Sequence, residues 1–409
     1  MNTSAAQGDG TVATHIKSLS ESARILVQNG DLRGAEDVYR AILDAAPYHG
    51  PALSFFARQA NDAGDPAKAL EFIEKAIKGN PGKLVHIQNR AKLYGGMGRL
   101  QDALDDLDLL LEQRPDAFTL LFHKALVLRD LGQRKEAVRT AIAAWQRCPN
   151  PEALVGAPDV PAYLGSQILE CANLIRATQL MYIDGELEPV VEQHGKEALQ
   201  RIFAAVSTFT GLHGTHANPE LSGLVLAGVN GYRAPKPAPD WLTGIEAAMG
   251  RLIHAANEAS RHAARGARDQ VQVISIQAAG LDTLLASLEP PVPLIRDTDT
   301  ETRVMEIPAG THVIRNRSAE NWKLTVYLPI EVANDATLAQ GTDVHRLSAG
   351  IAVVANPSSD DIVRNDGPAS VCLMRFSVWH PETTLAEQQG LQAVYRAIKR
   401  FDDHFVRQS

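Results

Sequence analysis

The sequence of 409 residues predicts an α+β protein with several domains. We expect an N-terminal α-solenoid of four helix–turn–helix repeats over 14–151, a helical middle region over 152–290, and a β domain over 295–409. Three observations support this fold class. Residue types recur every 34 positions in the first third, apolar residues follow helical spacing in the middle, and short apolar runs alternate with turn residues towards the end.

The 34-residue period holds for several residue types at once. Three sets keep their phase through four periods: Gly30, Gly64, Gly98 and Gly132; Pro47, Pro81, Pro115 and Pro149; Ala35, Ala69, Ala103 and Ala137. In the second repeat, the pattern predicts a helix over 51–63 that ends at Gly64 and a helix over 68–78 that Pro81 stops. These units resemble the tetratricopeptide family, whose repeats stack into a solenoid with a binding groove.

The same period predicts a row of basic residues on the first helices of successive repeats. Arg24, Arg58 and Lys92 share one phase, and Leu126 interrupts the series in the fourth repeat. Such a row could bind an acidic peptide in the groove of the solenoid. The alternative is that the three side chains are ordinary solvated charges.

The middle region has helical periodicity over 163–181, 196–209 and 241–264. The proline-rich segment 234–239 predicts a stiff connector, and 289–293 predicts the linker to the last domain. His213 and His216 could contribute to a metal site, but no cysteine or third histidine follows at ligand spacing. We therefore interpret them as part of a polar loop.

The last region predicts a small all-β barrel or sandwich closed by a helix. The expected strands cover 302–307, 312–315, 324–330, 350–354 and 371–378. Thr384 is a suitable N-cap for the closing helix over 385–405.

Several motifs of this region carry a resemblance to a known family. They are PAGTHV at 308–313, NWKL at 321–324, LPI at 328–330, SAGIAV at 348–353 and FSVWHPE at 376–382. Together they resemble the aspartyl/asparaginyl β-hydroxylases, over 305 to about 398. The resemblance implies a double-stranded β-helix, or cupin-like jelly roll, that uses Fe(II) and 2-oxoglutarate. Bacterial members of that family often carry tetratricopeptide repeats in front of this domain.

The sequence departs from the family where the resemblance would place its site. The two iron-binding histidines of the family fall on Asn316 and Asp361, a further histidine and arginine fall on Tyr327 and Thr325, and the arginine that resembles a clamp for the cosubstrate falls on Val371. An amide is a poor ligand for Fe(II), and valine cannot donate to a carboxylate. We therefore expect no confident catalytic residue and a domain that has lost both iron and 2-oxoglutarate.

Two other interpretations of this domain stay open at the level of sequence. An active peptidyl-Asp/Asn dioxygenase would need a non-standard metal site, for which His312, His345 and Asp361 are weak candidates. His312 lies four residues before Asn316, and this even offset places both on one face of a strand. Alternatively, Lys323, Tyr327 and Arg375 could line a small-molecule site. The favoured expectation is a protein-interaction scaffold with a catalytically silent β domain.

Composition limits the kinds of partner. The net charge of −8 gives no electrostatic support for a nucleic-acid role. The three cysteines form neither a disulfide framework nor a zinc pattern. The N-terminus does not resemble a signal peptide, and no apolar stretch approaches the roughly 20 residues of a membrane span. We expect a cytoplasmic protein with a protein or peptide partner, and neither nucleic acid nor membrane.

Overall fold

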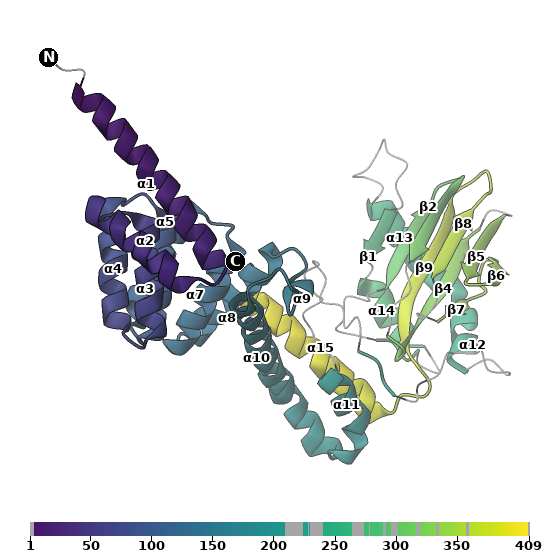
Figure 1. Ribbon diagram of the computed structural model, residues 1–409. Helices are drawn as coiled ribbons and strands as arrows, with labels where there is room; N and C mark the ends of the chain where they lie inside the picture. The colour runs from purple at the N-terminus through teal and green to yellow at the C-terminus, as the bar shows by residue number, and fades with distance from the viewer. Residues whose placement is uncertain are drawn as a thin grey trace. The chain divides into compact units, whose positions relative to one another are not determined.

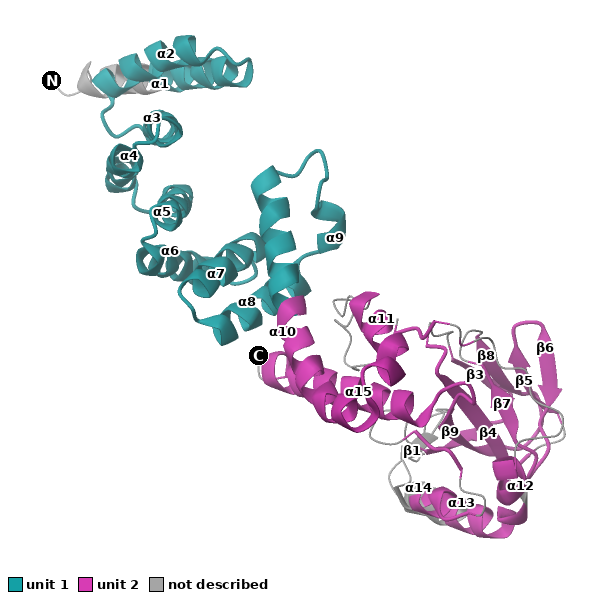
Figure 2. Ribbon diagram, turned by 90° about the horizontal axis from the view of Figure 1, so that it is seen from below, with its two compact units in different colours: residues 1–175, 408–409 teal, residues 176–407 magenta. Residues whose placement is uncertain are grey.

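A computed structural model describes residues 4–208, 224–227, 229, 240–263, 274–277, 279–288, 292–295, 302–315, 320–332, 335–356 and 360–407. The chain forms two compact units, one up to Ile175 and the other over Arg176–Arg407 (Figure 2). The expected middle region is therefore shared between them, and its expected boundaries do not coincide with the boundary of the units. His213 and His216 lie outside the described residues.

The first unit is built from helix pairs that stack one on the next (Figure 1). Its elements are α1 (Ser4–Gln28), α2 (Leu32–Ala45), α3 (Gly50–Asp62), α4 (Pro66–Gly79), α5 (Leu84–Gly96), α6 (Leu100–Gln113), α7 (Phe118–Asp130), α8 (Arg134–Arg147), α9 (Pro151–Leu154) and the start of α10 (Ala162–His194). The predicted helices over 51–63 and 68–78 correspond to α3 and α4.

The periodic glycines and alanines explain why this unit repeats. Gly30, Gly64, Gly98 and Gly132 have φ values of 81°, 82°, 72° and 77°, in the left-handed region that glycine adopts most easily. Each of these glycines ends the first helix of its repeat. At Gly64, for example, the N–H of Asp65 donates to the carbonyl of Ala60 at 2.9 Å. The four periodic alanines are completely buried, since only a small side chain fits where two helices cross closely.

The second unit contains two antiparallel sheets. The five-stranded sheet has the order β1-β2-β9-β4-β7 and the four-stranded sheet has the order β3-β8-β5-β6. The strands are β1 (Ile274–Gln277), β2 (Arg303–Ile307), β3 (Thr311–Arg315), β4 (Lys323–Glu331), β5 (Ala336–Gln340), β6 (Asp343–Arg346), β7 (Val353–Ala355), β8 (Asp361–Asn365) and β9 (Val371–Trp379). The strand expected over 350–354 is observed as the shorter β7, which begins at Val353. The strands β1, β5, β6 and β8 were not predicted.

The two faces of the five-stranded sheet have different neighbours. One face packs against the four-stranded sheet through a shared core that includes Met305, Leu338 and Val363. The other face packs against α12 (Asp240–Ala247), α13 (Met249–Ala263) and α14 (Ala279–Ala286). The single helix predicted over 241–264 is thus two helices, and the poor helix former Gly250 follows the break at Ala248.

A second core of this unit joins segments far apart in the sequence. It is formed by the second half of α10, by α11 (Gln200–Thr208) and by α15 (Leu385–Phe405), which carries the predicted Thr384 cap. The rings of Trp322 and Trp379 meet at 5.7 Å between centroids. The indole N–H of Trp322 donates to the carbonyl of Leu224 at 3.0 Å. The short helix η1 (Glu197–Leu199) precedes α11 and packs on α15.

Gly390 marks a close approach of α15 to this core. A Cβ at Gly390 would lie 2.9 Å from Leu199 and 3.2 Å from Ile202. Gly390→Ala is therefore expected to lower the free energy of unfolding by about 1–2 kcal/mol because of overpacking. The matched control is Gly185→Ala in α10, where a Cβ meets no atom and alanine should stabilise the helix by about 0.5–1 kcal/mol. Urea denaturation measures both, and equal effects would contradict the expectation.

Candidate functional site

The first unit has a groove lined mainly by α1, α3 and α5, the first helices of its first three repeats. Its volume is about 550 Å³. Arg24 from α1, Arg58 from α3 and Lys92 from α5 all line it, so the structure brings together the three basic residues that share a phase. Equivalent positions of stacked repeats face the same side of a solenoid, which explains this arrangement. Leu126, the fourth member of the series, is buried and adds no charge.

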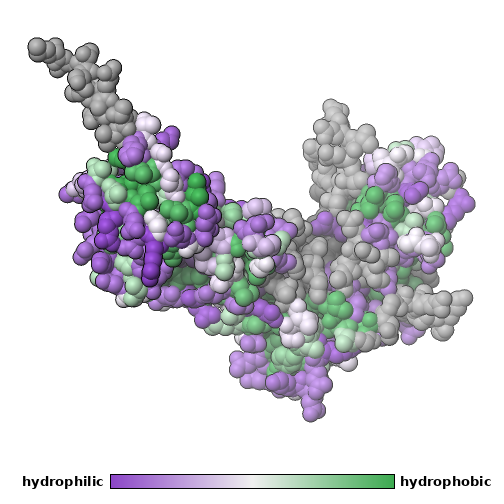
Figure 3. Space-filling model, in the orientation of Figure 1, coloured by the Kyte–Doolittle hydropathy of each residue, from purple (hydrophilic) through white to green (hydrophobic). Residues whose placement is uncertain are grey.

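Apolar and amide side chains complete the groove. Tyr39, Phe55, Ile73 and Leu93 supply hydrophobic surface. Figure 3 shows hydrophobic surface within mostly hydrophilic surroundings, where α1 and α5 lie in Figure 1. The side chains of Asn61 and Asn89 also line the groove, and each carries a donor and an acceptor that match the backbone groups of an extended peptide.

The three basic residues differ in how their charges are compensated. Arg24 donates to both carboxylate oxygens of Glu21, at 2.9 and 2.5 Å, on an exposed surface. Arg58 lies over the Phe55 ring at 6.0 Å, and the ammonium of Lys92 lies 4.3 Å from the ring centroid of Tyr163. Within the described part of the chain, neither Arg58 nor Lys92 forms an ion pair. Two cations in the groove are therefore available for an anionic ligand.

A half-buried histidine of α7, His123, lies close enough to Lys92 for the two charges to interact. Burial, together with the charge of Lys92, lowers the pKa of His123 from 6.5 to about 4. Burial also lowers the pKa of His49 and, helped by Lys83, that of His86. The neutral imidazoles fit the folded state, so their contribution to stability is complete above pH 6.5 and is lost as the pH falls towards the lowered values.

We expect His123→Gln to weaken this acid dependence. Between pH 6.5 and 4 the wild type should lose on the order of 2 kcal/mol more than the variant, because only the wild type must protonate the half-buried imidazole of His123. Denaturation of the full chain at several pH values, followed by the helical signal in far-ultraviolet circular dichroism, measures this difference. His15→Gln, at an exposed position of α1, is the control and should leave the slope unchanged. A variant with the wild-type slope would contradict the assignment.

The second unit contains a polar cluster between its two sheets, centred on Asp361. This residue is completely buried at the start of β8. Its Oδ2 accepts from Arg315 at 2.8 and 2.5 Å and from the Tyr327 hydroxyl at 3.1 Å. Its Oδ1 accepts from the amide of Gln340 at 3.0 Å. Both carboxylate oxygens are therefore occupied by donors from β3, β4 and β5.

This environment fixes the charges of the cluster. Burial would lower the pKa of Arg315, but Asp361 and Tyr327 outweigh it and the pKa is raised. Burial and the charge of Asp361 raise the pKa of Tyr327 to about 12, so its hydroxyl stays protonated and can donate to the carboxylate. The arrangement is that of a buried ion pair with its remaining hydrogen bonds satisfied.

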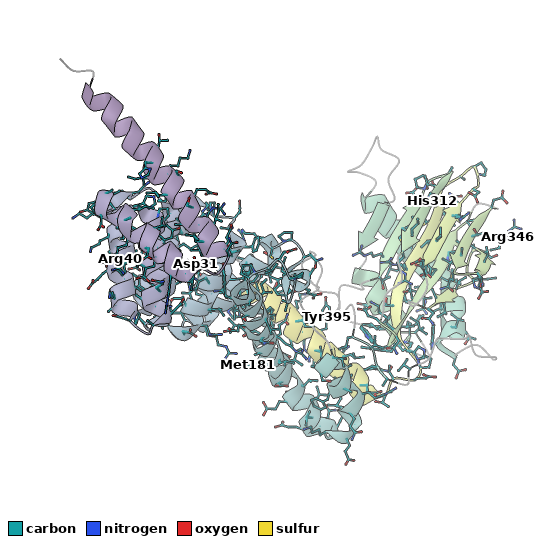
Figure 4. All side chains as sticks on the ribbon, in the orientation of Figure 1. Asp31, Arg40, Met181, His312, Arg346 and Tyr395 are labelled. Atoms are coloured by element: carbon teal, nitrogen blue, oxygen red, sulfur yellow. The ribbon has the colours of Figure 1, made fainter. Side chains whose placement is uncertain are left out.

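The histidine candidates do not join this cluster. His312 pairs with Arg364 in the ladder between β3 and β8, and it faces the exposed outer side of its sheet (Figure 4). Arg315, at an odd offset from His312, faces inward to Asp361. His345 lies on the fully exposed edge strand β6. The combination of His312, His345 and Asp361 as a metal site is therefore corrected, because His312 faces outward and His345 lies in the exposed edge strand, whereas Asp361 is completely buried.

The other positions at which the resemblance would place site residues are Asn316, Thr325 and Val371. Asn316 lies outside the described residues. Thr325 and Val371 are buried, and Val371 belongs to the apolar core between the sheets. Among the residues that the structure describes, no three histidine, cysteine, aspartate or glutamate side chains gather as a metal site would require. The described residues therefore do not fit an Fe(II) centre, for which imidazole and carboxylate ligands with open positions are needed.

Sequence reasoning missed Arg315 and Gln340, which hold Asp361. The sequence indicated one of the two residues in part, because Arg315 ends the strand predicted over 312–315. Their convergence depends on β5 and β8, which were not predicted, and pairing between distant strands cannot be derived from local alternation.

Comparison with known proteins identifies the repeat region. The family model described as tetratricopeptide repeat matches residues 21–83 and 89–153. No match was found among curated proteins. Across the described helices, none has both the length and the apolar content needed to cross a lipid bilayer.

Solved structures of repeat proteins resemble part of this chain. YrrB, described as a TPR protein with an unusual peptide-binding site, is 16% identical over 41% of this chain and 91% of its own, with a TM-score of 0.31. MamA is 18% identical over 41% and 92%, with a TM-score of 0.29. The O-GlcNAc transferase of Thermobaculum terrenum is 22% identical over 37% and 29%, with a TM-score of 0.30. The family match, together with the stacked helix pairs of the first unit, makes the N-terminal region a solenoid of tetratricopeptide repeats.

Proposed function

We propose that this protein is an interaction scaffold whose repeat groove binds an acidic peptide segment of a partner protein. The observation that carries the proposal is the placement of Arg58 and Lys92 in one groove without a carboxylate partner among the described residues. Asn61 and Asn89 supply hydrogen bonds to the peptide backbone, and Phe55 with Leu93 supplies apolar contact. Acidic side chains of the peptide would pair with the two cations, which favours acidic over basic segments.

Charge reversal in the groove tests this proposal. A fluorescein-labelled decapeptide of glutamate and leucine is the probe, and its binding to the full chain is followed by fluorescence anisotropy. Lys92→Glu and Arg58→Glu should each weaken binding by about tenfold, because each replaces an attraction by a repulsion. The loss should shrink as salt is added, since exposed charges are screened.

Arg40→Glu is the matched control. Arg40 lies on α2 and lines a separate hollow with Phe56 and Phe72, where it pairs with Glu36 at 2.6 Å (Figure 4). This variant has the same change in net charge but should keep the affinity within about twofold. Equal losses for Arg40→Glu and Lys92→Glu, or equal binding of a lysine–leucine peptide, would contradict a groove that selects acidic peptides.

We also propose that the β domain is a double-stranded β-helix that has lost Fe(II) chemistry. The support is the state of Asp361, whose oxygens accept from Arg315, Tyr327 and Gln340 rather than facing an open metal position. The residue at the position of the cosubstrate clamp, Val371, has no donor. Calorimetric titration with Fe(II) should show no saturable binding. Iron-dependent conversion of 2-oxoglutarate to succinate by the purified chain would contradict this proposal and support a peptidyl-Asp/Asn dioxygenase.

A further inference from the structure

One wall of the repeat groove contains a tyrosine at a position that is aliphatic in the other repeats. Tyr39 on α2 shares its phase with Ile73, Leu107 and Ala141, and all four side chains are buried. Equivalent positions of stacked repeats pack in the same way, so this position belongs to the core between helices. Because aliphatic side chains fill the position in the other repeats, core packing does not require the hydroxyl of Tyr39.

The hydroxyl of Tyr39 has no partner of its own within the described chain. Only 5% of the residue is exposed, and it lines the groove together with Arg24 and Arg58. Among the residues that the structure describes, none forms a hydrogen bond with this hydroxyl. Buried polar groups are normally satisfied, and one that is left unsatisfied costs free energy. The hydroxyl is therefore suited to a ligand that enters the groove.

Two guanidinium groups lie near this hydroxyl. Burial raises the pKa of Tyr39, and the positive charges of Arg58 and Arg24 oppose the rise, so both lie within electrostatic range of the phenol. The rings of Tyr39 and Phe55 meet at 4.9 Å between centroids, and Arg58 lies over Phe55. We call Tyr39, Arg24 and Arg58 the tyrosine end of the groove. The other cation among the lining residues is the single ammonium of Lys92.

One acidic residue competes with an anion at the tyrosine end. Glu21 pairs with Arg24, but both side chains are more than half exposed, at 57% and 53%. An exposed pair of this kind contributes little free energy, so a more highly charged anion can displace Glu21. Arg58 forms no ion pair among the described residues. An anion that pairs with Arg58 can therefore engage Arg24 as well.

We propose that Tyr39, Arg58 and Arg24 bind the phosphate group of a phosphorylated side chain in the peptide that occupies the groove. This inference rests on the proposed function of the groove and names the modification that the groove recognises. A phosphate group carries about two negative charges and several acceptor oxygens, so it can accept from both guanidinium groups and from the hydroxyl at once. A carboxylate has less charge and fewer oxygens, and it matches the single ammonium of Lys92.

Fluorescein-labelled decapeptides of glutamate and leucine test the site by fluorescence anisotropy with the full chain. They are identical except at the centre, which carries serine, phosphoserine, or two glutamates that match the net charge of the phosphoserine peptide. The phosphoserine peptide should bind about tenfold more tightly than the serine peptide and about threefold more tightly than the charge-matched peptide. The second difference isolates the geometry of the phosphate from its charge.

Two variants examine the tyrosine end directly. Tyr39→Phe removes only the hydroxyl and should weaken binding of the phosphoserine peptide by about three- to fivefold, with no change for the serine peptide. Glu21→Gln releases Arg24 and should strengthen binding of the phosphoserine peptide about twofold more than binding of the serine peptide. Tyr94→Phe is the matched control, because Tyr94 is buried in α5 and does not line the groove. It should leave the affinity of every peptide unchanged.

Each result bears on the proposal. A preference for phosphoserine that Tyr39→Phe reduces and Tyr94→Phe retains would support it. Equal binding of the phosphoserine and charge-matched peptides, or an unchanged preference in Tyr39→Phe, would overturn it. Complete displacement of the phosphoserine peptide by about 10 mM inorganic phosphate at constant ionic strength would also overturn it, since the site would then take free phosphate. If no peptide binds, the proposed function of the groove fails, whereas equal binding of the serine and phosphoserine peptides refutes this inference alone.

Discussion

Replacing Asp361 with alanine is expected to lower the free energy of unfolding of the second unit by about 3–5 kcal/mol. The variant leaves the guanidinium of Arg315 buried without its partner, and the Tyr327 hydroxyl and Gln340 amide also lose their acceptors. A buried charge without compensation costs more than the lost hydrogen bonds alone. Urea denaturation followed by tryptophan fluorescence measures the effect.

Two further variants separate charge from packing in this prediction. The double variant Arg315→Met with Asp361→Leu removes both charges and should recover most of the loss, because apolar side chains often replace a buried ion pair without cost. Asp343→Ala, on the exposed edge strand β6, should change stability by less than about 0.5 kcal/mol. If Asp361→Ala and Asp343→Ala behaved alike, Asp361 could not be the centre of a buried network.

The repeat unit could be predicted from sequence because its contacts are local. Each helix packs on the next along the chain, so the period of Gly64 and Ala69 contains nearly all the information that places Arg58. The placement of Arg24, Arg58 and Lys92 in one groove follows from that period. Their selectivity for an acidic peptide depends on a partner and stays a prediction.

The β domain could be predicted only in outline because its contacts are long-range. The strands richest in apolar residues, β4 and β9, were found at nearly their observed bounds. β8, with the sequence DIVRN, was missed because the residues at both of its ends are polar although they are buried. The inner Asp361 and Asn365 therefore resemble turn residues in the sequence, although both are completely buried.

This difference also explains the errors at the candidate metal site. The strand expected around His312 is observed as β3, but Asn316 lies outside the described residues, and alternation alone does not say which face of a strand is inward. That choice is set by the pairing of Val313 with the core residue Val363, which turns His312 outward. One residue of register decides whether a histidine lies in the interior or in solvent.

Replacing Glu387 with alanine is expected to destabilise the second unit by about 3 kcal/mol. Glu387 is buried in the first turn of α15, where it forms a capping box with Thr384: the backbone N–H of Thr384 donates to its carboxylate at 2.9 Å. Arg201 of α11 donates two further hydrogen bonds to the same carboxylate, at 2.5 and 2.6 Å. The variant loses a helix cap, worth about 1 kcal/mol, and leaves a partly buried guanidinium unpaired.

The pH dependence of the Glu387 contribution distinguishes charge pairing from simple packing. Burial would raise the pKa of Glu387, but the hydrogen bonds from Arg201 and Thr384 outweigh it, and the pKa is lowered. The stabilisation is therefore complete above the ordinary carboxyl pKa and is lost as the pH falls through the lowered value. Glu387→Gln, which keeps the shape, should differ from the wild type at pH 7 and approach it below about pH 4. Glu192→Ala at an exposed position of α10 is the control and should be neutral, whereas a constant difference between Glu387→Gln and the wild type at all pH values would exclude the ion pair as the cause.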